Sequence, residues 1–310
     1  MNRALTAVDR WFTGPAPAER LAVFRILLGL FTVTYLVVRL PVFWSLADGR
    51  SSRFLPVGVL SSLTGPVPGP VVQALVIIAV IAAIGFTVGG RFRLTGSTLA
   101  LCMLLLGTYR NSWGQLLHFE NLMVLHLLVV GMSPAADAHS LDARRRRVGA
   151  GPSPSAAYGW PLRLSALIMV ITYVLAGVAK LRYGGIDWML GDTLQNHVAY
   201  SAARLELLGG TPAPLAGPLV DRAWLFPPLA AATVVLELAA PVALLRSRLR
   251  TWWVVGAWLM HAGIVALMFI VFPYPLFGVA FAPLYALERL PGAVRARVAG
   301  KRISEATTAL

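Results

Sequence analysis

The chain alternates between long apolar segments and short polar connections. A helix of about 20 mainly apolar residues crosses a bilayer, so the pattern predicts an all-α transmembrane bundle of eight spans. These spans cover about Leu21–Trp44, Pro70–Val88, Leu94–Tyr109, Leu116–Met132, Pro161–Leu181, Ala223–Leu245, Thr251–Phe272 and Pro273–Leu287. The third and eighth are short, and the prolines of the eighth favour a broken or tilted helix there.

The composition agrees with a membrane protein. Of the 310 residues, 57% are hydrophobic and only 13% are charged, whereas soluble domains carry roughly 25% charged residues. This excludes a cytosolic enzyme, a disordered chain and a secreted disulfide scaffold. The single cysteine, Cys102, has no partner with which to form an intrachain disulfide or a zinc site.

The basic residues set the expected orientation. Placing the N-terminus inside puts most of the 27 Lys and Arg residues on the cytoplasmic side. Both termini are therefore expected to be cytoplasmic, with an arm over 1–20, a transmembrane domain over 21–287 and a basic tail over 288–310. The net charge of +14 is then explained by cytoplasmic loops near lipid headgroups, and no nucleic acid partner is expected. We expect a multi-pass protein of the inner membrane.

Ionisable residues inside the spans are the candidates for function, since a charge in the bilayer is costly. Lys180 lies on one helical face with Tyr173, Ala176 and Gly177, and the small residues allow a partner helix to approach. A lysine in such an apolar cleft is a candidate base. The alternative is a lysine that extends to the outer headgroups as an interface anchor.

Glu237 and His261 lie deep in the sixth and seventh predicted spans. Glu237 is expected to be protonated, paired with Lys180 or an arginine, or exposed to a wet cavity. A hydrogen bond between packed helices explains it equally well. A lone buried histidine is more often a packing residue than a catalyst, and both interpretations stay open for His261.

The fourth predicted span contains a second group of polar residues. On a helix, His118 and Asn121 share a face, while Glu120 lies on a different side and His126 is rotated away. This arrangement does not support a compact metal site within the helix, and no metal is predicted.

Several of these stretches resemble the HTTM superfamily, which includes the membrane part of vitamin K-dependent gamma-carboxylase. The most specific is Thr172–Leu181, which ends in Ala176-Gly177-Val178-Ala179-Lys180-Leu181 and is followed by Asp187-Trp188 and Gly191-Asp192. The segment around Glu237, with His261 24 residues later, is similar to an acidic residue and a histidine of that family. Phe24-Arg25-Ile26 and Ser140-Leu141-Asp142-Ala143-Arg144 are similar to its bacterial members.

The resemblance implies a quinol-linked, carboxylase-like activity on an unknown substrate. Lys180 would be the base that deprotonates a reduced quinone of the menaquinol or vitamin K type, with Glu237 and His261 in the same site. The residues expected to bind substrate or quinone are Tyr173, His118, Asn121 and Glu120. The carboxylases have an Asn-His pair where this chain has Glu120-Asn121, a departure from the family pattern. The alternative is a non-enzymatic membrane protein, either a small-molecule permease or an accessory subunit.

Overall fold

The protein is all-α in a computed structural model that describes residues 3–49, 51–146, 152–245 and 247–289, and these residues contain no β-strand. The α-helices are α1 (Arg3–Thr13), α2 (Ala18–Val38), α3 (Leu40–Ser45), α4 (Gly69–Val88), α5 (Phe92–Asn111), α6 (Asn121–Gly131), α7 (Leu141–Arg145), α8 (Ala156–Gly184), α9 (Asp187–Leu190), α10 (Thr193–Leu207), α11 (Ala216–Val220), α12 (Phe226–Leu238), α13 (Arg248–Met268) and α14 (Pro273–Leu276). The chain divides into two compact units. Unit 1 comprises 1–117, 124–164 and 282–310, and unit 2 comprises 118–123 and 165–281.

Five of the described helices are long and apolar enough to cross a membrane. They are α2, α4, α5, α8 and α13, and they match the first, second, third, fifth and seventh apolar segments of the sequence. The shorter apolar helices are α6 and the segment 223–238. The all-α class is confirmed, while the number of spans and the side of each terminus stay predictions.

The fourth apolar segment is not helical over its whole length, because α6 begins only at Asn121. The residues before it lie in an irregular segment. The side-chain amide of Asn111 donates to the carbonyl of Leu117 (3.1 Å) and accepts from the Leu117 N–H (3.0 Å). Both backbone groups of Leu117 are therefore bonded to a side chain, which offers them an alternative to helical hydrogen bonds.

Prolines interrupt the last part of the chain. The sixth apolar segment is divided into a 3-10 turn, α12 and a 3-10 helix over Ala240–Leu244, with Pro241 at the start of the latter. The eighth segment forms α14 and a 3-10 helix over Val279–Leu284. Proline lacks the N–H that a continuing helix needs and clashes with the preceding turn. As a result, Glu237 lies in the last turn of α12 and not in the middle of a long helix.

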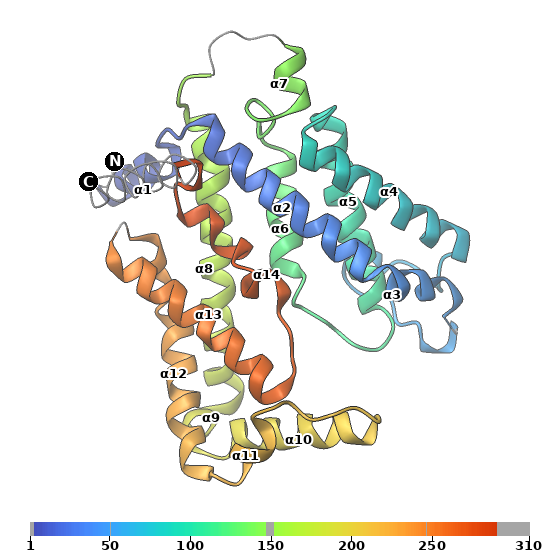
Figure 1. Ribbon diagram of the computed structural model, residues 1–310, viewed down its shortest axis with the longest axis vertical. Helices are drawn as coiled ribbons and strands as arrows, with labels where there is room; N and C mark the ends of the chain where they lie inside the picture. Colours follow the sequence, from blue (N-terminus) through green and yellow to red (C-terminus); the bar gives the residue numbers. More distant parts are fainter. Residues whose placement is uncertain (1–2, 50, 147–151, 246, 290–310) are drawn as a thin grey trace, which may run out of the picture. The chain divides into compact units, whose positions relative to one another are not determined.

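In unit 1, α4 packs against both α2 and α5, and the three helices lie side by side in Figure 1. Small residues allow close contacts here. A Cβ atom at Gly96 of α5 would lie 2.8 Å from the backbone oxygen of Gly131, and one at Gly131 would lie 2.7 Å from that of Gly96. Helices α5 and α6, which carry Gly96 and Gly131, therefore meet backbone to backbone, the packing that glycine permits between apolar helices.

The most deeply buried charge of unit 1 is Arg25, in the second turn of α2, which is fully buried. Its guanidinium donates to the carbonyl oxygens of Ala135 (3.0 Å), Ala138 (3.5 Å), His139 (2.7 Å) and Thr87 (3.4 Å). One side chain thus fixes the end of α4 and the segment between α6 and α7 against α2. Carbonyl acceptors compensate the loss of hydration that burial imposes on the guanidinium.

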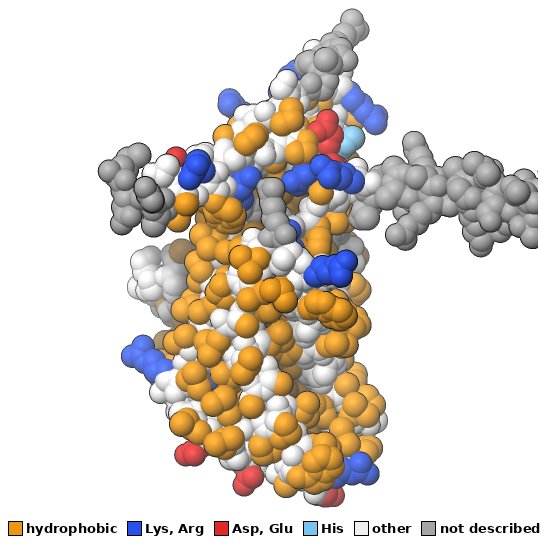
Figure 2. All heavy atoms as spheres, turned by 90° about the vertical axis from the view of Figure 1, so that its left-hand side faces the viewer, with side chains coloured by type: hydrophobic (Ala, Val, Ile, Leu, Met, Phe, Trp, Pro, Cys, Tyr) orange, Lys and Arg blue, Asp and Glu red, His pale blue; other side chains and the backbone are white. Residues whose placement is uncertain are grey.

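In unit 2, α12 packs against α13. Of the shorter helices, α9 packs against α12, α11 against α13, and α10 against both. A small core formed by Val198, Ala213, Ala216 and Phe226 joins α10 and α11 to the start of α12. The outward faces of α8, α12 and α13 carry exposed Leu175, Val235 and Leu259. Figure 2 shows one face of the molecule on which hydrophobic side chains predominate. Exposed apolar area of this kind is expected where helices face lipid.

Candidate functional site

Two glycines allow the last turn of α12 to fit between α8 and α13. A Cβ atom at Gly177 of α8 would lie 3.0 Å from the Leu238 side chain and 3.1 Å from Cβ of Glu237. A Cβ atom at Gly256 of α13 would lie 3.0 Å from Leu236. The backbone is also fixed here, because the indole N–H of Trp253 donates to the carbonyl of Leu236 (2.9 Å). The position of Glu237 is therefore determined by contacts with both neighbouring helices.

Lys180 and Glu237 form an ion pair. The Lys180 Nζ atom lies 2.6 Å from Oε1 and 2.8 Å from Oε2 of Glu237. The exposed fraction of the side chain is 23% for Lys180 and 6% for Glu237. Lys180 Nζ also lies 5.2 Å from the centroid of the Trp188 ring, a distance at which the face of an indole attracts a cation. The lysine therefore bonds to the carboxylate, and the proposal that it extends to headgroups as a simple anchor does not describe this geometry.

A second polar pair joins α8 to α13. The Tyr173 hydroxyl is 2.8 Å from Nε2 of His261, and both side chains are buried. The other ring nitrogen of His261, Nδ1, is buried and has no hydrogen-bond partner among the described residues. Tyr173 also packs edge to face on Trp253 (5.1 Å between centroids). Aromatic packing thus holds the tyrosine in place, and one imidazole nitrogen is left for a further partner.

These four side chains line one cavity of about 180 Å³, which lies wholly within unit 2. The remainder of its wall is mainly apolar. It is formed by His118, Phe119, Leu122, Thr172, Ala176, Met260, Ile264, Phe272 and Pro275. A mainly apolar cavity with a few converging polar groups is the usual form of a site for a small molecule.

Some of the residues proposed from the sequence line the cavity and others do not. Lys180, Glu237, His261 and Tyr173 converge, and His118 joins them from the segment before α6, with its ring 5.7 Å from that of Phe272. Glu120 is buried, and Asn121 is exposed. Neither of these two is among the residues that line the cavity. The expected shared helical face of His118 and Asn121 does not form, because His118 precedes the helix.

Sequence reasoning missed the apolar wall. The ring of Phe272 packs against the rings of both His118 and His261, with centroid distances of 5.7 Å and 5.2 Å. Phe119 and Pro275 also contribute. Nothing distinguishes these residues from the many other apolar residues of the chain, so no pattern identifies them. The described residues contain no group of three or more His, Cys, Asp or Glu side chains that could hold a metal ion.

The family model described as the HTTM domain matches residues 14–288 of the chain. This range includes every residue that lines the cavity. No curated protein and no solved structure matches the chain.

Proposed function

The chain belongs to the HTTM family and is a multi-pass membrane protein, and from this premise we propose that its cavity performs acid–base chemistry on a reduced quinone in the inner membrane. The observation that carries the proposal is the contact of 2.6 Å between Lys180 and Glu237 at the wall of a cavity. An amine and a carboxylate in hydrogen-bond contact can exchange a proton, and the cavity gives a substrate access to them.

The pair supplies the base as follows. Transfer of one proton from the Lys180 ammonium to the Glu237 carboxylate leaves a neutral amine and a neutral acid. A low-dielectric site brings this neutral form closer in energy to the ion pair, because desolvation disfavours separate charges. The amine then takes the proton of a substrate hydroxyl, and the resulting ammonium lies near the face of Trp188, which stabilises it.

His261 and Tyr173 orient the substrate. With Nε2 bonded to the Tyr173 hydroxyl, the unpartnered Nδ1 of His261 is the group that a substrate oxygen would satisfy. Which nitrogen carries the proton depends on the tautomer. In either tautomer the ring offers one further hydrogen bond, as donor or as acceptor.

The cavity fits the ring of a quinone and not its tail. Its volume of about 180 Å³ is smaller than the roughly 300–1,000 Å³ of sites that enclose a whole drug-sized ligand. The rings of Phe119 and Phe272 and the side chains of Leu122 and Ile264 provide an apolar wall suited to a flat ring system. Bound there, a reduced quinone would supply reducing electrons. Those electrons would drive a carboxylase-like modification of a further substrate.

One observation favours the alternative of a non-enzymatic permease or accessory subunit. Lys180 and Glu237 satisfy each other, which is also what two helices need in order to pack with their charges compensated. The two functions differ in their dependence on the amine, and substitution of Lys180 separates them.

The test is quinol turnover by the purified protein in lipid nanodiscs. Reduced menaquinone and reduced vitamin K are supplied with oxygen, and oxygen uptake and quinone products are measured for wild type, Lys180→Ala and Arg182→Ala. Arg182 is the matched control, because it is an exposed cation at the same end of α8. We expect Lys180→Ala to lose at least about 100-fold in rate, the usual contribution of a general base. Arg182→Ala is expected to keep wild-type activity.

Binding of quinone is measured in parallel by quenching of tryptophan fluorescence. Quinone binding by wild type without any turnover would favour a permease. Absence of both binding and turnover in folded wild type would overturn the quinol proposal, as would full activity of Lys180→Ala. A variant Lys180→Arg that behaves as wild type in every assay would indicate a packing role.

A further inference from the structure

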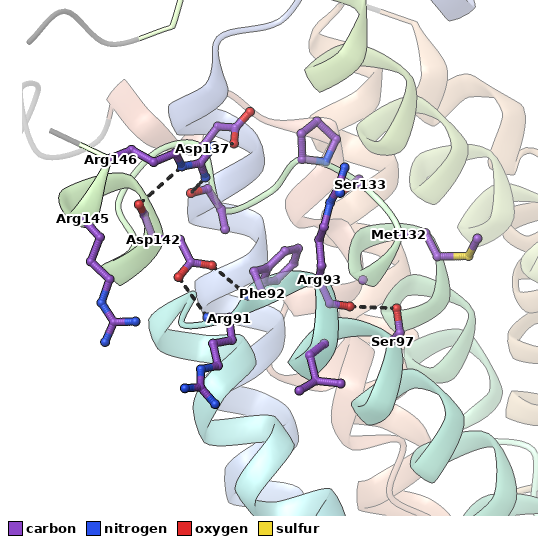
Figure 3. Close-up of a pocket in the computed structure, with 14 residues that line it drawn as sticks. Arg91, Phe92, Arg93, Ser97, Met132, Ser133, Asp137, Asp142, Arg145 and Arg146 are labelled. Carbon is purple, nitrogen blue, oxygen red and sulfur yellow. Dashed lines mark hydrogen bonds and ion pairs between the residues drawn. The ribbon is translucent and has the colours of Figure 1, made fainter. Parts of the chain in front are cut away.

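Unit 1 contains a large open pocket at the start of α5 (Figure 3). Its volume is about 1060 Å³. Three stretches of chain line it: the first turns of α5, the segment that follows α6, and α7. The residues are Arg91, Phe92, Arg93, Leu94, Ser97, Gly131, Met132, Ser133, Pro134, Ala136, Asp137, Asp142, Arg145 and Arg146. We refer to it as the basic pocket.

The basic pocket has an excess of positive charge, with four arginines against two aspartates. Both aspartates are already bonded within the protein. Asp142 accepts from the backbone N–H groups of Arg91 (2.9 Å) and Phe92 (2.8 Å). Asp137 accepts from Arg146 (3.0 Å) and from the hydroxyl of Tyr158 (2.9 Å). The carboxylates are therefore occupied by other groups of the protein.

Three guanidinium groups have their donors available. Within the described part of the chain, the side chains of Arg91, Arg93 and Arg145 make no hydrogen bond and no ion pair. Figure 3 shows Arg91, Arg93 and Arg145 as lining residues, with dashed lines from the side chain of Arg146 but from none of these three guanidinium groups. A guanidinium carries five N–H donors in a planar arrangement that matches the oxygens of a phosphate.

The backbone around these arginines is held in place. Arg91 adopts a left-handed conformation (φ 47°), and the two hydrogen bonds to Asp142 fix it and cap the start of α5. The Ser140 hydroxyl accepts from the Ala143 N–H (2.8 Å) and caps α7 in the same way. Because these elements are fixed before any ligand arrives, little conformational entropy is lost on binding.

The pocket also has an apolar edge. Leu94 (63% exposed) and Met132 (77% exposed) are among its lining residues. α5 is long and apolar enough to cross a membrane, so its first turn lies at the level of lipid headgroups. The distribution of Lys and Arg along the chain predicts that this is the cytoplasmic side, where anionic lipids attract basic groups. A soluble phosphate compound would use the arginines but not the exposed leucine and methionine.

We propose that the basic pocket binds the phosphate of an anionic phospholipid headgroup, with the acyl chains lying along the exposed apolar residues Leu94 and Met132. Figure 3 shows the side chains of Arg91 and Arg145 extending in the same direction, and the phosphate oxygens accept from these two guanidinium groups. The side chain of Arg93 extends toward Ser133 and adds its positive charge to the pocket. Such a lipid is a structural ligand of unit 1 and does not depend on the chemistry proposed for unit 2.

The test is lipid binding by delipidated protein in a neutral detergent, followed by native mass spectrometry during titration with phosphatidylglycerol or phosphatidylcholine. The double variant Arg91→Gln/Arg93→Gln is compared with Arg204→Gln/Arg222→Gln, in which both arginines are exposed and lie on unit 2. We expect wild type to prefer phosphatidylglycerol. The pocket variant is expected to lose about 25-fold in affinity for it, since each arginine near an anionic headgroup contributes about a factor of five. The control variant should bind as wild type does.

Competition identifies the source of the phosphate. Glycerol phosphate and inorganic phosphate are added at the same concentrations as the lipid, and Leu94→Gln is tested as well. We expect weak competition and a loss of lipid affinity in Leu94→Gln. Equal affinity for glycerol phosphate would overturn the lipid proposal in favour of a soluble phosphate ligand. Equal affinity for the two lipids, or an equal loss in both double variants, would overturn the site itself. If the double variant does not fold, Arg145→Gln provides the same comparison.

Discussion

Buried positive charges have different partners in the two units. In unit 1 the guanidinium of Arg25 is surrounded by backbone carbonyl oxygens, which also belong to the segments that it holds together. In unit 2 Lys180 bonds to the side chain of Glu237, and both line a cavity. The first arrangement surrounds the charge with carbonyl oxygens, which do not change protonation. The second combines an ionisable partner with a cavity. Buried charge alone therefore does not mark a functional site, and the nature of its partner is the better guide.

The largest effect is expected for Arg25→Met, which removes the donors from several buried carbonyl oxygens. Each buried acceptor left unsatisfied costs about 1–3 kcal/mol, and we expect a total loss of on the order of 3–5 kcal/mol in unfolding free energy. Thermal unfolding in detergent measures it, with the exposed Arg204→Met as control, for which a change within about 0.5 kcal/mol is expected. A loss as small as that of the control would show that Arg25 is not the structural centre of unit 1.

The second effect tests whether Lys180 and Glu237 act as a unit. Lys180→Met leaves the buried Glu237 without its cation, and we expect a loss of about 3 kcal/mol, the lower end for a broken buried pair. The double variant Lys180→Met/Glu237→Leu removes both charges and is expected to recover most of that stability. Quinol turnover should stay absent in it. Stability that falls further in the double variant would mean that the two residues are not coupled.

The long helices could be predicted from the sequence, whereas the start of α6 and the breaks in the sixth segment could not. Hydropathy alone located the five long helices, because a run of apolar residues determines burial in lipid whatever the tertiary contacts. It could not locate the start of α6, since that depends on a hydrogen bond from Asn111 to Leu117, outside the helix. Pro241 was visible in the sequence, but its effect on the sixth segment depends on how the neighbouring residues pack.

The candidate site was accessible to sequence reasoning only in part. The cost of charge in a bilayer singled out Lys180, Glu237 and His261 one at a time. Their convergence depends on the closeness of α8 and α12 at Gly177, a distance that no spacing within one helix can give. For the same reason Glu120, which has the same chemistry as Glu237, could not be separated from it beforehand.

The third effect concerns that close contact. Gly177→Ala adds a Cβ atom 3.0 Å from Leu238 and 3.1 Å from Cβ of Glu237, so α8 and α12 must separate slightly. We expect a net loss of about 1 kcal/mol in the free energy of unfolding, since the cost of overpacking exceeds the gain in helix propensity. The quinol turnover rate is expected to fall as well. Gly263→Ala is the matched control: it lies within α13, no atom lies within 4 Å of an added Cβ, and it should stabilise by about 0.5–1 kcal/mol. Stabilisation by both changes would contradict the tight contact.

The smallest effect is expected for Asp142 of unit 1, whose carboxylate accepts hydrogen bonds from the backbone N–H groups of Arg91 and Phe92. Burial acts to raise the pKa of its carboxyl group, but the N–H groups of Phe92 and Arg91 and the charges of Arg146 and Arg145 outweigh it and hold the pKa below its ordinary value. A carboxylate with a lowered pKa in the folded state contributes stability that is fully present above the pKa of the unfolded chain. That contribution is lost as the pH falls through the folded pKa.

Asp142→Asn should therefore cost up to about 1 kcal/mol at pH 7 and progressively less in acid. The melting temperatures of wild type and Asp142→Asn, measured from neutral to acid pH, are expected to converge. Curves that stay parallel would mean that the ionised carboxylate of Asp142 does not hold the start of α5.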